Sequence, residues 1–344
     1  MSWLEAELRE QPAALSRLLE RQAGRAGEVA SLFSGDDVRY VLIASRGTSS
    51  NAARYAQYLL GRAHRVPVMF ATPSLYTIYE QPPRLDGAVV VGISQSGASP
   101  DVVGVLEEAR RQGRPTVALT NDDGSSLAHA ADAVLPLEAG PERAVAATKT
   151  YMNSLGAIAL LFAAVDGGAA SDELARMPER LERQIELSFT SAPPLEEYED
   201  VVGATVIGRG VLYGTAFEIA LKIRELSGLL VEAYSPADLM HGPIAAIRER
   251  WPVLLVAPSG PARASVEELV EPLHERGARL LVVSDAKAAL ERAHTPLPLV
   301  EGVPEWLSPL TAVVPGQVTG MRLARLRGLD VDRPEGLSKV TLTT

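Results

Sequence analysis

The strongest constraint on the fold of this chain is an internal repeat. Residues 89–122 and 253–285 share one pattern: an apolar run, a turn, an amphipathic segment that ends in glycine, and a second apolar run. The glycines that end the amphipathic segments, Gly113 and Gly277, lie 164 residues apart. Self-similarity at a fixed spacing indicates a duplicated structural unit.

A second landmark gives nearly the same spacing. Arg46 and Arg209 each follow an apolar run and precede a glycine, and they lie 163 residues apart. Chance recurrence of similar units is the alternative, and the shared spacing argues against it. The sequence therefore predicts two copies of one domain, with the boundary near residue 195.

Each copy alternates short apolar runs with amphipathic segments. In the first copy, residues 38–44 predict a buried strand, residues 45–50 a loop and residues 51–61 a helix, and the alternation then continues. Such alternation is typical of a doubly wound parallel sheet. With 344 residues, 47% of them hydrophobic, the chain is long enough for two α/β domains.

Composition excludes several classes of function. The net charge of −10 argues against general nucleic-acid binding, which needs a basic surface. The chain has no cysteine, which excludes disulfides, thiolate metal sites and a cysteine nucleophile, and none of its five histidines has a metal-type spacing with another. The apolar runs are too short to span a membrane and the N-terminus is acidic, so we expect a cytoplasmic protein without membrane contact.

Two polar turns follow predicted strands and precede predicted helices. They contain Gly47, Thr48 and Ser49 in the first turn, and Ser94, Gln95, Ser96 and Ser99 in the second. Helix N-termini present free N–H groups and partial positive charge, and open parallel sheets bind ligands at these strand ends. Each turn alone is more often an ordinary helix cap than a binding site. Together they predict a seat for a phosphate group.

In the second copy, a predicted helix that runs as far as Leu230 is mostly apolar but carries charged side chains. Glu218, Lys222 and Glu225 are spaced i, i+4 and i+7, so they project from one side of the helix. Charges on a buried helix cost several kcal/mol unless they are paired or used. With His241 sixteen residues further on, this group can move protons. The alternative is a solvated salt-bridge ladder and an ordinary loop histidine.

The two copies have diverged at their turns. The second copy has Ala257-Pro258-Ser259-Gly260 where the first has its serine-rich turn. The simplest interpretation is a phosphorylated small molecule that the first copy binds and the second copy converts. We therefore expect the serine-lined turns and the helix that carries Glu225 to face one crevice.

Five segments in order resemble the SIS (sugar isomerase) domain family in its double-domain form. They are RGTSSNAA, SQSGASPD, VAATKTY, ALKIRELSGLLVEAYSPADLMHGP and GLSKVT. The resemblance covers nearly the whole chain. It includes the isomerase half of glucosamine-6-phosphate synthase and, more closely, the free-standing glucosamine-6-phosphate deaminases. It implies an α/β fold of two tandem domains, each a three-layer αβα sandwich around a parallel flavodoxin-like sheet.

The resemblance also implies an order of domains. A helical segment at residues 1–33 precedes SIS domain 1 with its phosphate-binding loops at 34–194. SIS domain 2, with the catalytic glutamate and histidine, covers residues 195–329, and a tail at 330–344 lies over the active site.

Roles follow from the same resemblance. The residues that match the seat of the sugar phosphate are Gly47, Thr48, Ser49, Ser94, Gln95, Ser96 and Ser99. Glu225 matches the base that moves a proton between C1 and C2, and Lys222 matches the cation that stabilises the enolamine or enolate. His241 matches the ring-opening residue, which relatives supply from a neighbouring subunit, so the resemblance implies a homodimer. Lys339 matches a tail lysine that contacts the ring or carbonyl, with a solvated tail lysine as the alternative.

Some positions depart from the synthases. Arg46 stands where they usually have cysteine, Ala147 stands where they have serine, and Glu335-Gly336 replaces basic and amide residues in the tail. Without a cysteine, we expect no transfer of nitrogen from glutamine by the synthase route. We expect conversion of glucosamine 6-phosphate to fructose 6-phosphate and ammonia, without a metal or an organic cofactor. The alternatives are a fructosamine-6-phosphate deglycase, a phosphosugar isomerase that releases no nitrogen, and a non-catalytic sugar-phosphate regulator.

Overall fold

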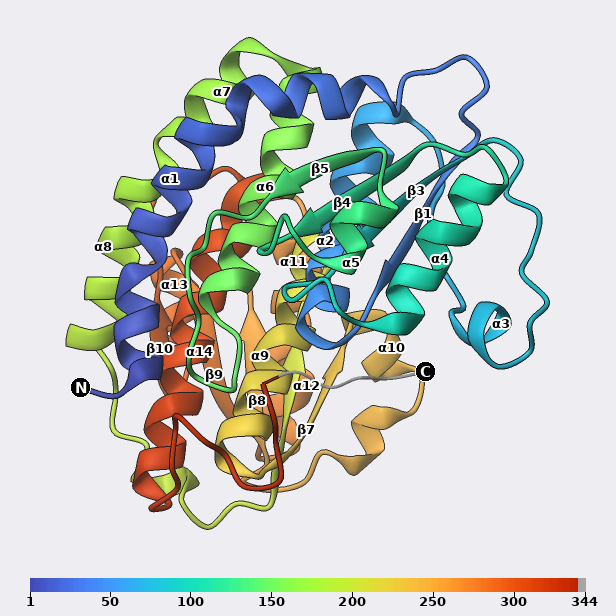
Figure 1. Ribbon diagram of the computed structural model, residues 1–344. Coiled ribbons are helices and arrows are strands. Elements are labelled where there is room, and N and C mark those ends of the chain that lie inside the picture. Colours follow the sequence, from blue (N-terminus) through green and yellow to red (C-terminus); the bar gives the residue numbers. More distant parts are fainter. Residues whose placement is uncertain (340–344) are drawn as a thin grey trace. The chain divides into compact units, whose positions relative to one another are not determined.

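The computed structural model describes residues 1–339 (Figure 1). The predicted tail at 330–344 therefore lies partly outside the described residues. The chain forms two compact units. The N-terminal unit consists of Gln11–Glu142, Lys149–Arg176 and the described end of the chain from Ser338. The C-terminal unit consists of Met1–Glu10, Arg143–Thr148 and Met177–Leu337. The domain limits predicted from the sequence stay a prediction.

The N-terminal unit is built on a parallel sheet of five strands in the order β2-β1-β3-β4-β5. The strands are β1 (Tyr40–Ser45), β2 (Val68–Phe70), β3 (Ala88–Ile93), β4 (Thr116–Thr120) and β5 (Ala133–Pro136). In the central strand, Val90 lies opposite Leu42 on one side and Thr116 on the other. All six residues of β3 are buried, because helices cover both faces of the sheet.

Alternate residues of these strands pack into two separate layers. Leu42, Val90 and Ala118 point to one face, where they form a core with helices α4 and α5. Helices α2 and α6 pack against each other and supply no residue to that core. The helices of this unit are α2 (Gly47–His64), α3 (Ser74–Thr77), α4 (Pro100–Arg111), α5 (Ser126–Ala130), α6 (Lys149–Asp166) and α7 (Gly168–Ala175). Helix α1 (Trp3–Ser31) begins in the C-terminal unit and continues into the N-terminal one.

The sheet of the C-terminal unit repeats this strand order. Its order is β10-β9-β8-β6-β7, so in both sheets the first strand of the copy lies between the second and the third. The strands are β6 (Gly203–Ile207), β7 (Leu230–Tyr234), β8 (Pro252–Val256), β9 (Arg279–Ser284) and β10 (Thr295–Pro298). Both sheets are all parallel and have the flavodoxin-like order. The predicted fold, two tandem α/β sandwiches of one topology, is confirmed.

Helices cover both faces of the second sheet as well. On one face, short helices pack over Val253 and Leu255 of β8. These are α10 (Pro236–Met240), α11 (Arg263–Glu267), α12 (Val270–Glu275) and α13 (Lys287–Leu290). The longer helices α8 (Met177–Thr190), α9 (Tyr213–Ser227) and α14 (Ser308–Leu326) pack together and contribute no residue to that core. The 3₁₀ turns are η1 (Glu196–Tyr198), η2 (Gly210–Leu212), η3 (Pro243–Ala246) and η4 (Glu305–Leu307).

Helix α9 is held against α14 by close contact. A Cβ atom added at Gly316 of α14 would lie 2.4 Å from Cγ1 of Ile219. Only glycine lets the two helices approach to this distance. Helix α9 is therefore buried on several sides, with Glu218 and Lys222 among its buried residues.

Two local predictions were wrong. The turn predicted at residues 45–50 is shorter, because α2 begins at Gly47 and takes Thr48 and Ser49 into its first turn. The apolar helix does not reach Leu230, because Gly228 ends it with a left-handed backbone (φ 71°). Leu230 lies on the edge strand β7 and is 74% exposed. Along residues 1–339, no helix combines the length and the apolar character that crossing a membrane requires.

Candidate functional site

The predicted phosphate residues lie where the sheet of the N-terminal unit changes winding direction. From β1 the chain passes to β2 on one side, and from β3 it passes to β4 on the other. Open α/β sheets bind ligands outside the carboxyl ends of such strands. The first turn of α2 follows β1, and the turn from Ser94 to Ser99 follows β3, so both predicted turns lie at this position.

The turn after β3 is shaped by its own hydroxyl groups. The Oγ atom of Ser94 accepts the N–H of Gly97 at 3.2 Å, and the Oγ atom of Ser96 accepts the N–H of Ala98 at 3.3 Å. Gly97 has φ +60°, and a Cβ atom there would lie 2.0 Å from Oγ of Ser125. Glycine is therefore required at this position. Ser99 is the N-cap of α4, although its side chain makes no capping hydrogen bond.

A buried carboxylate, which the sequence analysis missed, lies at the start of α4. Asp101 is 0% exposed, and its Oδ1 atom accepts the N–H of Val102 at 2.9 Å. Its Oδ2 atom accepts Nε of Arg46 at 2.6 Å, which joins the two turns of the site. Acidic residues are so common in the first turn of a helix that nothing in the sequence singles this one out.

The same turn in the C-terminal unit is closed by the protein's own carboxylates. The N–H of Ser259 donates to Oδ1 of Asp285 at 2.7 Å, and the N–H of Ala262 donates to Oε1 of Glu305 at 2.8 Å. Backbone donors that an anion would use are thus already paired. The interpretation that only the first copy keeps an anion seat stays a prediction.

The charged residues of α9 form a buried group. Lys222 is 1% exposed, and its Nζ atom lies 3.6 Å from Oε1 of Glu218, which is 0% exposed. The same Nζ atom donates to Oε2 of Glu225, whose side chain is 23% exposed. The alternative of a solvated ladder is wrong for Glu218 and Lys222. A buried cation between a buried and a half-buried carboxylate can hold Glu225 in place and compensate negative charge beside it.

His241 lies at the C-terminal end of α10 in the same unit, and it is exposed. Ser235 begins this helix, and its Oγ atom accepts the N–H of Asp238 at 3.1 Å. The next residue, Gly242, has φ +139°, a conformation that side chains other than glycine rarely adopt. The cap and the glycine together fix the turn that carries His241.

Lys339 is bound within the N-terminal unit. Its Nζ atom donates to Oε2 of Glu142 at 2.8 Å, and its side chain is 24% exposed. The carboxylate of Glu142 is 0% exposed and also accepts the N–H and the hydroxyl of Thr150, at 3.1 and 2.7 Å. The alternative of a solvated tail lysine is therefore wrong. Glu142 was missed because it lies 197 residues before its partner.

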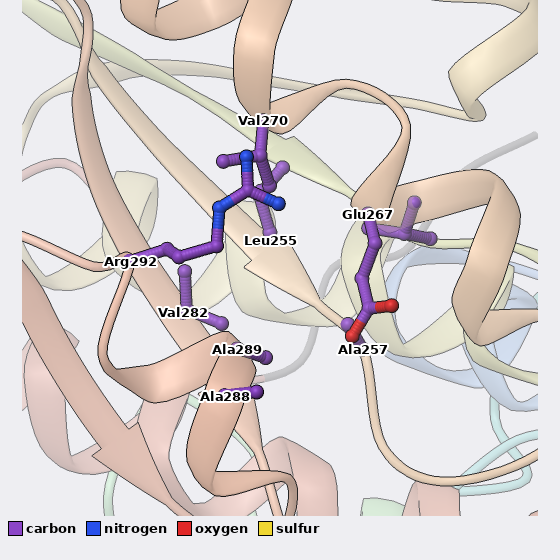
Figure 2. A pocket seen from close by; sticks show the side chains of 9 residues that line it. Leu255, Ala257, Glu267, Val270, Val282, Ala288, Ala289 and Arg292 are labelled. Carbon is purple, nitrogen blue, oxygen red and sulfur yellow. The ribbon is translucent and has the colours of Figure 1, made fainter.

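A small cavity lies away from these groups, in the C-terminal unit. It has a volume of about 100 Å³ and an apolar lining that includes Leu255, Val270 and Val282. Figure 2 shows Glu267 and Arg292 on opposite sides of this lining. At an offset of 164 residues, Val270 occupies the place of the larger Leu106, which packs in the core of the first copy. None of the predicted site residues lines the cavity.

The described part of the chain contains no group of three histidine, aspartate or glutamate side chains that could hold a metal ion. The chemistry available at the groups above is that of carboxylates, ammonium groups, an imidazole and hydroxyls.

Comparison with known proteins identifies the family. The SIS domain profile matches residues 37–164 and 203–293, one match in each copy. The chain belongs to the SIS domain family. The glutamine–fructose-6-phosphate aminotransferase (isomerizing) of Zymomonas mobilis is 31% identical over 353 residues, which cover 98% of this chain and 58% of that protein. This SIS protein thus spans less than two thirds of the length of the curated relatives it matches.

Solved structures agree with the fold. The C-terminal domain of the glucosamine-fructose-6-phosphate aminotransferase of Francisella tularensis superposes with a TM-score of 0.82 at 26% identity, and covers 97% of this chain and 98% of its own. A glucosamine-6-phosphate deaminase of Thermotoga maritima gives a TM-score of 0.78 at 22% identity, with 99% and 100% covered. At that identity the second likeness concerns the fold alone.

Proposed function

We propose that this SIS protein converts glucosamine 6-phosphate and water to fructose 6-phosphate and ammonia. The observation that carries the proposal is the buried group on α9. Glu225 is the member of that group with an exposed face, and Lys222 holds it from the buried side. Moving a proton between neighbouring carbons needs such a positioned carboxylate and a nearby cation.

The reaction divides into steps that these residues suit. His241 assists opening of the pyranose ring, which gives the C1 aldehyde and the C2 amine. Glu225 removes the proton from C2 and returns it to C1, while Lys222 stabilises the negative charge that develops in between. The product is an imine at C2. Water adds to this imine, and the resulting carbinolamine loses ammonia to leave the C2 ketone.

The first copy supplies the seat for the phosphate in this proposal. Gly47, Thr48 and Ser49 begin α2, and the turn from Ser94 through Gln95 and Ser96 to Ser99 precedes α4. Both helix N-termini lie at carboxyl ends of neighbouring strands. Lys339 serves the carbonyl or ring oxygen, as the resemblance implies. The names of two relatives support the substrate class, because both describe aminotransferases and both include fructose 6-phosphate.

Ammonia release tests the proposal. Wild type is expected to release ammonia from glucosamine 6-phosphate, and Glu225→Gln is expected to lower kcat by roughly 10²- to 10⁴-fold, the usual worth of a general base. Tryptophan fluorescence of the variant at low denaturant confirms that it is folded. No ammonia from wild type, or an unimpaired Glu225→Gln, would refute the assignment.

A mixing experiment tests the proposed homodimer with His241 supplied across the interface. Glu225→Gln and His241→Asn are each expected to be inactive alone. Mixed dimers would then contain one site with both residues intact, and would recover roughly a quarter of wild-type activity when half of the dimers are mixed. Failure to recover activity in verified mixed dimers contradicts the shared site.

A further inference from the structure

The two turns at the β1 and β3 strand ends contain a single cationic side chain. In residues 45–50 and 94–99 this is Arg46, and the other residues are glycine, alanine or neutral polar residues. The chain as a whole has a net charge of −10. A dianionic phosphate is therefore repelled at long range and needs a cation where it binds.

The hydrogen bonds of the turn increase this need. The hydroxyl groups of Ser94 and Ser96 accept N–H groups of their own turn. At the start of α4, the carboxylate of Asp101 accepts the N–H of Val102. That carboxylate places negative charge at the helix terminus that was predicted to attract the anion. Helix N–H groups alone are thus a weak seat, and Arg46 is the group that restores positive charge.

The guanidinium of Arg46 is oriented from one side. Its Nε atom donates to Oδ2 of Asp101 at 2.6 Å, where the carboxylate is fully buried and hence fixed. The Arg46 side chain is 51% exposed, and its terminal amino groups make no bond to any of residues 1–339. A guanidinium has a planar fork that matches two phosphate oxygens. An arginine held through Nε keeps this fork available.

The second copy provides an internal comparison. Arg209 occupies the same position with nearly the same backbone, φ −133° and ψ 150° against −136° and 158° for Arg46. The residue that matches Asp101 at an offset of 164 is Ser265, whose hydroxyl donates to the carbonyl of Ala262 at 2.9 Å. The buried carboxylate partner is therefore present only in the copy that keeps the serine-rich turn.

We propose that Arg46 is a substrate-binding residue that donates to the phosphate oxygens of the sugar phosphate. Asp101 is the positioning residue that directs its guanidinium to the strand ends. The inference rests on the proposed function for the identity of the substrate. It adds a cation to a seat that the sequence analysis built from hydroxyl groups and helix ends alone.

Kinetics with Arg46→Gln, Arg46→Lys and Asp101→Asn test the inference, with Arg209→Gln as the matched control. Arg46→Gln is expected to raise KM for glucosamine 6-phosphate and Ki for inorganic phosphate by roughly 10- to 100-fold, with kcat changed little. Arg46→Lys keeps the charge without the fork and is expected to lie between wild type and Arg46→Gln. Asp101→Asn is expected to raise Ki for phosphate, and Arg209→Gln to leave both constants unchanged.

Ligand-induced thermal stabilisation separates this inference from the proposed function, because it needs no turnover. Wild type is expected to be stabilised by glucose 6-phosphate more than by glucose, and Arg46→Gln is expected to lose this difference. If wild type releases no ammonia but the difference in stabilisation between glucose 6-phosphate and glucose depends on Arg46, the inference about Arg46 is supported and the proposed function is refuted. If ammonia is released with unchanged KM and Ki in Arg46→Gln, or if Arg209→Gln causes the same loss, the inference is overturned. Should Asp101→Asn fail to fold, the exposed Arg46 variants decide the outcome.

Discussion

The buried group on α9 makes a quantitative prediction for Lys222→Met. Methionine has nearly the volume and shape of the lysine stem, so the substitution removes the charge without opening a cavity. It leaves the carboxylate of Glu218, which is 0% exposed, without the cation 3.6 Å away. At an effective dielectric constant of about 20, two unit charges at that distance attract by about 5 kcal/mol.

The net loss is smaller than this attraction. Glu225 is partly exposed, so water compensates its lost bond. Breaking a buried ion pair from one side typically costs about 3 to 5 kcal/mol, because the remaining charge stays buried. We therefore expect Lys222→Met to lower the free energy of unfolding of the C-terminal unit by about 3 to 5 kcal/mol.

Tryptophan fluorescence is a suitable assay because all three tryptophans belong to the C-terminal unit. They are Trp3, Trp251 and Trp306. Urea titration followed by fluorescence thus reports on the unit that carries α9. Lys287→Met is the matched control, because Lys287 forms an exposed ion pair with Glu291 at 3.7 Å. This substitution is expected to leave the urea midpoint unchanged.

The double variant Glu218→Gln/Lys222→Met distinguishes the cause. It removes the buried charge together with its partner, and it is expected to recover most of the stability that Lys222→Met loses. The reasoning is refuted if Lys222→Met unfolds at the wild-type urea concentration, or if the double variant is less stable than Lys222→Met alone.

Three further predictions concern stability. Gly316→Ala is expected to lower the free energy of unfolding by about 1 to 3 kcal/mol, because the added Cβ atom would lie 2.4 Å from Ile219. The control Gly320→Ala places its Cβ atom 3.4 Å from the nearest atom and is expected to be neutral or stabilising. Equal urea midpoints for the two variants would contradict this prediction. Val270→Leu is expected to fill the cavity and stabilise by about 1 kcal/mol, measured in the same way, and a loss of stability would show that the cavity is no packing defect. Burial and the charges of Arg279 and His274 lower the pKa of His294, so the unfolded state binds its proton first. The stability that neutral His294 contributes is therefore complete above pH about 6.5, and it falls as the pH decreases below that value. His294→Asn is expected to reduce the loss of stability between pH 7.5 and 5.5, and an unchanged loss would exclude this histidine as its source.

The fold could be predicted from the sequence because its signals are periodic and repeated. Apolar runs in the sequence predict the buried strands. The near-constant offset between the two copies predicts that both have the same topology. The spacing of Glu218, Lys222 and Glu225 placed the three on one side of a helix, and the structure joins them through Lys222. These inferences need only local geometry.

The remainder of the site depends on contacts between distant segments. Glu142 binds Lys339 across 197 residues, and Asp101 binds Arg46 across 55, so no local pattern indicates either pair. The end of α9 was misplaced for a related reason. Leu230 continues the apolar pattern of the helix, but the edge strand on which it lies leaves it exposed.

The two copies differ in how the same backbone satisfies its donors at the strand ends. In the second copy, Asp285 and Glu305 accept N–H groups of the turn after β8, so an external anion would have to displace built-in carboxylates. In the first copy, Asp122 matches Asp285 at an offset of 163 but accepts the N–H of Gly124 at 3.0 Å instead. The turn after β3 therefore has no counterpart of the Asp285 contact, and the carboxylate at the start of α4, Asp101, holds the guanidinium of Arg46 instead. One topology can thus satisfy its strand-end donors through different carboxylates in its two copies, and it is in these carboxylates that our proposal of an anion seat in the first copy alone can be tested.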